Sequence, residues 1–283
     1  MKYFLLALLL LPTFSMAQTA KRSYTTDKFP GKECNNVIDN KLDPVGVMRS
    51  PSECEVLFDH YVRVTFDEAF SNLFFRKGGD WAANELPNLD QIKAVGKGTE
   101  IQCFRLRDTD KGDFNYDMQA HPTSPNGITW AKRYDSLTHS SSGPVPYEKL
   151  KQFFYDAKTS TRIVLYTDIN AVSASMTFYK GGHEILKIPN TFLVIRGPYV
   201  AANTGGGEDN VTEACLVLIG KWKSANVKKE SDGTFSFQTD GLATNASPHL
   251  RVQNIYMRIE CNKEMQDRLL KEIDFAKLNE LLR

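Results

Sequence analysis

The chain has 283 residues, with 35 lysines and arginines against 34 aspartates and glutamates, 41% apolar residues and five cysteines. A nearly neutral charge excludes a protein that binds nucleic acid mainly by neutralising phosphates, and it excludes a polybasic membrane binder. With 24% charged and 11% aromatic residues, the composition is that of a folded chain and not of a disordered one.

The first 17 residues have the pattern of a secretory signal peptide. Lys2 supplies the positive end, an apolar run covers residues 4–11, and the small residues Ser15 and Ala17 precede an expected cleavage after Ala17. The apolar run is too short to span a bilayer, and no later segment has the apolar length of a transmembrane helix. We therefore expect a secreted or periplasmic protein of 266 residues without stable membrane insertion, whose formal charge falls from +1 to zero when Lys2 is removed.

All five cysteines follow the signal peptide, and export permits disulfide bonds. Cys34 and Cys54 flank a turn-rich segment, which makes Cys34–Cys54 a candidate bridge. Cys215 and Cys261 lie at the edges of two strand-like runs and form a second candidate, with Cys103 left over. Several other pairings are equally compatible with the sequence. No metal site is expected, because Cys-x-x-Cys does not occur and the five histidines are scattered.

The first expected element is a helix over 52–77. Ser52 and Glu55 have the spacing of a capping box, apolar residues recur at helical spacing, and Gly78 and Gly79 are expected to end the helix.

The pattern changes after residue 99. A strand is expected over 101–106, then a long stretch dominated by loops over 107–146, because Gly, Pro, Asp, Ser and Asn are frequent there, and then a helix over 146–156. Short runs rich in β-branched and apolar residues predict strands at 162–167, 174–179, 185–188, 191–196, 216–223, 234–238 and 252–260. The glycine-rich segment 201–210 is expected to be a loop. An apolar stripe predicts an amphipathic helix over 262–283 that packs on the core of the chain.

Helices lead, strands then dominate and a helix follows them, which is the order of an α+β fold. The expected organisation is a helical N-terminal region over 18–98, a strand-rich core over 99–261 and a C-terminal helix over 262–283.

Three features in the middle of the chain have a chemical pattern. Arg105 follows an aromatic residue in the first expected strand, residues 140–142 are three serines, and Glu184 begins a strand that leads to Pro189 and to Phe-Leu-Val at 192–194. In this order the segment from about 100 to 200 resembles the mono-ADP-ribosyltransferases of the Arg–Ser–Glu class, which include secreted toxins and animal ecto-enzymes.

The resemblance implies a split-sheet core and cleavage of the nicotinamide–ribose bond of NAD, with transfer of ADP-ribose to a protein acceptor or to water. Such a cleavage passes through an oxocarbenium-like state, which the carboxylate of Glu184 would stabilise. Arg105 would grip the NAD diphosphate with two parallel hydrogen bonds. Ser140, or Ser141 beside it, would bind the cofactor and orient the carboxylate. No metal is required.

The helix after the serines adds a weaker expectation, that Phe153 or Phe154 stacks on the nicotinamide ring. One position departs from the family, because Gly182 replaces the first residue of its Glu-x-Glu pair. This departure leaves arginine-directed transfer, NAD hydrolysis, transfer to another acceptor and loss of activity open. The alternative hypothesis is a non-catalytic secreted binding protein or effector that presents the loops at 107–146 and 201–210 to a host or surface partner.

Overall fold

The structure is a computed structural model. It describes residues 53–83, 115–139, 143–171, 173–178, 182–200, 211–223, 226–241 and 252–282. Several sequence predictions fall outside this part of the chain: the signal peptide, the Cys34–Cys54 bridge, Cys103 and Arg105 with their strand, the serines at 140–142 and the loop at 201–210.

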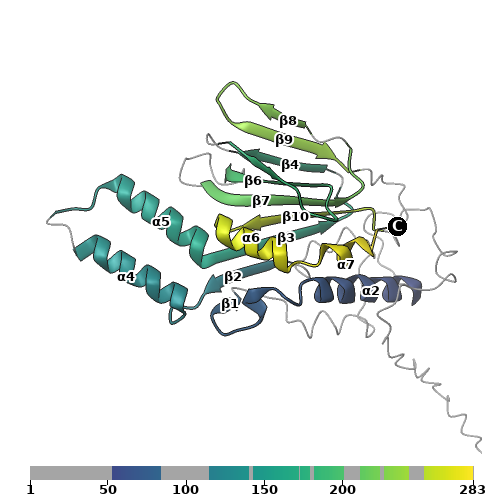
Figure 1. Cartoon of the computed structure of the whole chain (residues 1–283), viewed down its shortest axis with the longest axis horizontal. Helices are drawn as coiled ribbons and strands as arrows, with labels where there is room; N and C mark the ends of the chain where they lie inside the picture. The colour runs from purple at the N-terminus through teal and green to yellow at the C-terminus, as the bar shows by residue number, and fades with distance from the viewer. Residues whose placement is uncertain are drawn as a thin grey trace, which may run out of the picture.

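Ten strands form the sheet of the protein (Figure 1). They are β1 (Trp81–Ala83), β2 (Tyr116–Ala120), β3 (Arg162–Ile169), β4 (Ser173–Phe178), β5 (Glu184–Leu186), β6 (Leu193–Val200), β7 (Val211–Gly220), β8 (Asn226–Lys229), β9 (Phe235–Asp240) and β10 (Asn254–Glu260). Their order is β1-β2-β3-β10-β7-β6-β4-β9-β8, and β5 pairs with β6 outside this path. Neighbouring strands are antiparallel, so the described strands make one antiparallel sheet.

The helices are α2 (Glu53–Ala69), the short 3-10 helix η1 (Phe74–Arg76), α4 (Pro125–His139), α5 (Tyr147–Thr161), α6 (Lys263–Glu272) and α7 (Phe275–Asn279). Helices together with a large sheet confirm the predicted α+β class. The seven strands predicted after residue 160 are all present, as β3, β4, β5, β6, β7, β9 and β10. Within the described residues, none of the helices combines the length and the apolar character that crossing a membrane requires.

The prediction of a loop-dominated stretch over 107–146 is wrong for its described part, which contains β2 and the whole of α4. Ser124 is the reason that α4 begins where it does. Its hydroxyl accepts a hydrogen bond from the backbone N–H of Gly127 at 3.1 Å, and Pro125 is the first helical residue. A serine cap followed by proline is a favoured helix start, and it outweighs the turn-forming composition.

Two other predicted helices have different boundaries. The helix predicted over 52–77 ends at Ala69, whose carbonyl accepts a hydrogen bond from the backbone N–H of Asp274 at 3.0 Å. The helix predicted over 262–283 is broken at Ile273, which has an extended backbone. Asp274 then caps α7 by accepting from the N–H of Lys277 at 2.9 Å. The aspartate therefore favours a second helix start over continuation.

Buried side chains form a core on each face of the sheet. The larger one joins α2, α6 and α7 to one face of β2, β3, β10 and β7, and α6 crosses in front of β10 and β3 in Figure 1. The other joins the opposite face of β7 to β4 and β9. In β7, Val217 and Ile219 belong to the first core and Leu216 and Leu218 to the second, so this antiparallel strand is buried on both faces. A one-residue shift of its register would exchange the two faces.

A hairpin of two helices, α4 and α5, extends beyond the edge of the sheet (Figure 1). Its seam is aromatic. Trp130 and Tyr134 on α4 pack against Phe153 on α5, with ring centroids 5.5 and 5.6 Å apart. No residue of α4 is fully buried. The hairpin is therefore attached to the rest of the protein mainly through α5. One side of α4 faces the N-terminal end of α6.

Candidate functional site

Only part of the predicted catalytic set lies in the described residues. Arg105, Ser140 and Ser141 lie outside them, whereas Glu184 is the first residue of β5 and Phe153 and Phe154 belong to α5. The two described groups have different partners. The phenylalanines pack against Tyr134 of α4, and Glu184 pairs with an arginine of β6.

That arginine is Arg196, which sequence reasoning missed. It is only 7% exposed, and it lies directly opposite Glu184 in the β5–β6 pairing. Its Nε donates to Glu184 Oε2 at 2.8 Å and its Nη1 donates to Asp267 Oδ1, on α6, at 2.6 Å. The hydrogen bond and the charge of Arg196 lower the pKa of Glu184, so this half-exposed carboxyl group is ionised at neutral pH.

Cys215 and Cys261 are both buried free thiols, so the structure does not contain the candidate bridge between them. Burial raises the pKa of Cys215 to about 12 and that of Cys261 well above its usual value. Thiols of this kind are inert side chains of the core, since it is the thiolate that reacts.

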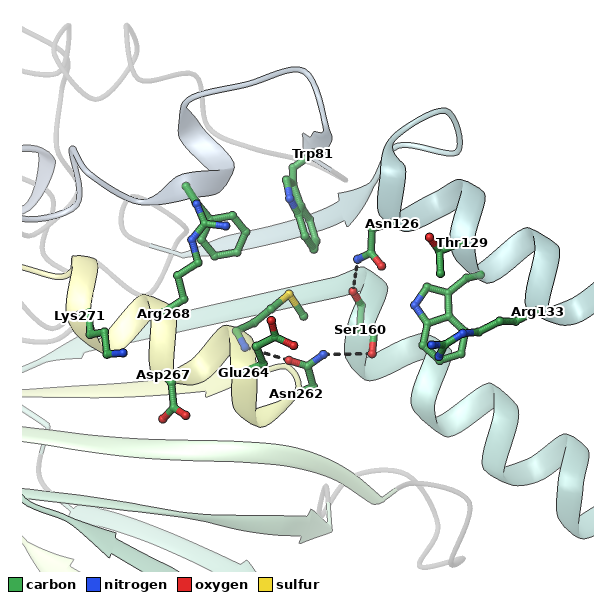
Figure 2. A pocket seen from close by; sticks show the side chains of 13 residues that line it. Trp81, Asn126, Thr129, Arg133, Ser160, Asn262, Glu264, Asp267, Arg268 and Lys271 are labelled. Carbon is green, nitrogen blue, oxygen red and sulfur yellow. Dashed lines mark hydrogen bonds between the residues drawn. The ribbon is translucent and has the colours of Figure 1, made fainter.

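A cavity of about 750 Å³ lies between the α4–α5 hairpin, α6 and the segment from η1 to β1 (Figure 2). Its lining residues come from distant parts of the chain: Phe74, Trp81, Asn126, Thr129, Trp130, Arg133, Ser160, Asn262, Glu264, Met265, Asp267, Arg268 and Lys271. Its volume is within the range of small-molecule sites in proteins.

Hydrogen bonds around Ser160 hold the base of the cavity together. The carbonyl of Ser160 accepts from the side-chain amide of Asn126 on α4, and its hydroxyl accepts from the amide of Asn262 at 3.0 Å (Figure 2). Asn262 is also the N-cap of α6, because its Oδ1 accepts from the N–H of Met265 at 2.9 Å. One serine and two asparagines thus fix the ends of α4, α5 and α6 relative to one another.

Aromatic rings and guanidinium groups line the sides of the cavity away from Ser160. Arg133 lies over the Trp130 ring with its Cζ 4.7 Å from the centroid, and Arg268 lies over Phe74 at 4.0 Å. Phe74 meets Trp81 edge to face at 5.7 Å. In Figure 2, Trp81, Arg133 and Glu264 approach the cavity from β1, α4 and α6 respectively.

The charges of the lining are only partly neutralised. Asp267 pairs with Arg196, and Arg268 pairs with Glu272 at 2.8 Å. In contrast, Arg133, Lys271 and Glu264 form no ion pair within the part of the chain that the structure describes. The cavity therefore presents two cations and one carboxylate that are available to a ligand.

Sequence reasoning missed this cavity because its lining comes from separate segments of the chain, at 74–81, 126–133, 160 and 262–271. The Trp130–Arg133 pair has the i, i+3 spacing of a helix face, but the surrounding segment was expected to be loop. Recognising the Ser124–Pro125 helix start would have placed both side chains on one side of α4. Asp267 connects this cavity to the predicted carboxylate Glu184 through Arg196.

Over the described ranges, no cluster of three or more His, Cys, Asp or Glu side chains has the arrangement of a metal site. Comparison with known proteins gave no match: no family model fits the chain, and no curated protein or solved structure is significantly similar to it.

Proposed function

We propose that the protein is an exported binding protein that holds a small molecule in the cavity between α4 and α6. The observation that carries this proposal is the lining of the cavity. Two indole rings and three charged groups without an ion-pair partner in the described chain converge on about 750 Å³ of space. Charged side chains beside aromatic rings are typical of ligand sites, where polar groups fix orientation and aromatic rings supply affinity.

The hydrogen bonds between the lining segments indicate that the site is formed before a ligand binds. The hydrogen bonds of Ser160 with Asn126 and Asn262 fix the helix ends that carry the lining before any ligand arrives. Binding then costs less free energy for ordering protein side chains than it would in a flexible groove.

The experiment uses the full mature chain and ligand-detected NMR with a chemically mixed panel of fragments. Thr129→Trp fills the cavity from α4, and Ala131→Trp adds the same ring to an exposed position of α4 outside the lining. We expect fragments that bind the wild type and Ala131→Trp and that no longer bind Thr129→Trp. If no fragment binds, or if both variants retain all binders, the cavity is not a ligand site and the proposal is wrong.

A second candidate is the NAD-cleaving enzyme that the sequence resemblance implies. The observation in its favour is that Glu184 is half exposed and has a lowered pKa, as a carboxylate that stabilises a ribosyl cation requires. Arg105, Ser140 and Ser141 would have the roles stated above. The single sheet of the described strands does not confirm the split-sheet core that this hypothesis implies.

The test of the second candidate is nicotinamide release from NAD by the mature protein, with Glu184→Gln as the comparison. Release by the wild type that falls at least about 100-fold in the variant supports the enzyme, since catalytic carboxylates contribute on that scale. Equal release from both proteins, or none from either, removes this candidate and leaves the binding protein.

A further inference from the structure

We infer that the ligand class of the cavity is an aromatic ring that carries an anionic group, a phosphate or a carboxylate. This inference rests on the proposed function and goes beyond it by naming the chemistry that the site recognises.

The aromatic part of the inference comes from the two indoles. Trp130 packs against Phe153 in an edge-type contact at 5.5 Å, and Trp81 packs against Phe74 in the same way at 5.7 Å. These contacts hold the two indoles in constant positions. Fixed indole faces favour a planar ligand that stacks, because stacking uses the face and needs no directional hydrogen bond.

The anionic part comes from the charges of the lining. The lining itself contains three cations, Arg133, Arg268 and Lys271, and two carboxylates, Glu264 and Asp267, and so it has one more cation than carboxylates. The N-terminal end of α6 also opens on the cavity, since its cap Asn262 is part of the lining, and helix N-termini favour anions.

Each part of such a ligand has a group of the lining to bind it. Arg133 lies over one face of the Trp130 ring, with its Cζ 4.7 Å from the centroid, so a planar ligand that stacks on this pair would bring its anionic substituent to the guanidinium. Lys271, on the α6 side, adds a second cation. Glu264 is free to accept a hydrogen bond from an amino or hydroxyl group of the ring system. A volume of about 750 Å³ accommodates a molecule of mononucleotide size.

The experiment measures the affinity of each probe for the mature protein by isothermal titration calorimetry, and tryptophan fluorescence locates the site. Of the three tryptophans, Trp81 and Trp130 line the cavity, whereas Trp222 is 5% exposed and donates its indole N–H to the carbonyl of Ile219. Quenching by AMP, which is not fluorescent, therefore reports on the cavity, whereas the indole probes are followed by calorimetry alone. The probes separate the ring from the charge: AMP has both, adenosine has only the ring, inorganic phosphate has only the anion, and tryptamine is an aromatic cation. Indole-3-acetate replaces the phosphate with a carboxylate.

We expect AMP or indole-3-acetate to bind at least about tenfold more tightly than adenosine, phosphate or tryptamine, because one charge-assisted hydrogen bond is worth about that factor. The tighter of the two shows whether phosphate or carboxylate is preferred. In Arg133→Gln the affinity for that anion should fall about tenfold while the affinity for adenosine is unchanged. Lys223→Gln removes an exposed cation outside the lining and should change neither affinity.

Any of four results would overturn the inference. Adenosine or tryptamine binding as tightly as the aromatic anions would show that the anion is not recognised, and an unchanged affinity in Arg133→Gln would show that the arginine is not its partner. If every probe fails but some fragments bind the wild type and not Thr129→Trp, the ligand class is wrong and the proposed function still stands. Failure of every probe and every fragment overturns both.

Discussion

Replacing Asn262 by alanine is expected to lower the free energy of unfolding by about 2 kcal/mol. Two interactions are lost. The side-chain oxygen accepts from the N–H of Met265 as the N-cap of α6, and such caps contribute about 1 kcal/mol. The side-chain amide donates to the hydroxyl of Ser160 at 3.0 Å, and a half-buried hydrogen bond between neutral groups contributes about 1 kcal/mol.

Two further variants separate these contributions. Asn262→Asp keeps an oxygen that caps the helix and removes the amide donor, so we expect a loss of about 1 kcal/mol. Ser160→Ala removes only the acceptor hydroxyl, and its loss is also about 1 kcal/mol. The double variant Ser160→Ala/Asn262→Ala should lose about 2 kcal/mol rather than about 3, because the bond between the two side chains can be lost only once.

The assay is urea unfolding of the mature protein at neutral pH, followed by circular dichroism and by fluorescence to check that the transition is two-state. Strict additivity of the two single losses would show that the Ser160–Asn262 bond contributes nothing to stability. A loss below about 0.5 kcal/mol in Asn262→Ala would show that neither interaction does. Either result would refute the argument that these side chains fix the helix ends around the cavity.

Three further measurements test other parts of the structure. Arg196 lowers the pKa of Glu184, so this pair stabilises the fold above the unfolded carboxyl pKa of about 4.3 and the contribution is lost as the pH falls through the lowered folded value. The urea midpoints of the wild type and Arg196→Gln should therefore converge on acidification, and a constant difference would contradict the pairing. Gly220→Ala should lose at least about 1–2 kcal/mol, because Gly220 has φ of +87° and an added Cβ would meet a carbonyl oxygen at 2.5 Å. Gly78→Ala, with no atom within 4 Å of its Cβ, is the control, and equal midpoints would refute the glycine argument. Burial raises the pKa of Cys215 to about 12, so peptide mapping should find this thiol unmodified by iodoacetamide until the protein unfolds; alkylation in the native state would contradict its burial.

The strands could be predicted because runs of β-branched and apolar residues are local. In β3, Ile163-Val164-Leu165 is such a run, and it is visible in the sequence although the alternation of buried and half-buried residues is not. In β4 the alternation itself is visible, because the buried Ala174, Met176 and Phe178 are separated by polar residues. The helix α4 could not be recognised by composition, since the polar cap at Ser124 decides its start and none of its residues is fully buried.

The site was less accessible to sequence reasoning than the fold. Glu184 was identified as a candidate carboxylate, but its partner Arg196 is set by the register of β5 on β6, which a single sequence does not reveal. The cavity depends on contacts between α4 and α6, whose residues are more than 100 positions apart, as the Ser160–Asn262 bond is. Long-range pairing of this kind follows from packing of the whole chain and not from any local pattern.

The position of β10 in the sheet has a consequence for how the protein folds. This strand lies between β3 and β7, although it follows both of them in the sequence. During synthesis, the strands from β1 to β3 and those from β4 to β9 emerge first as two separate groups, each with an open edge where β10 will pair. Open edges of this kind are templates for aggregation. The two groups can be joined only after residues 254–260 have been synthesised, so completion of the sheet requires pairing between strands that are far apart in the sequence.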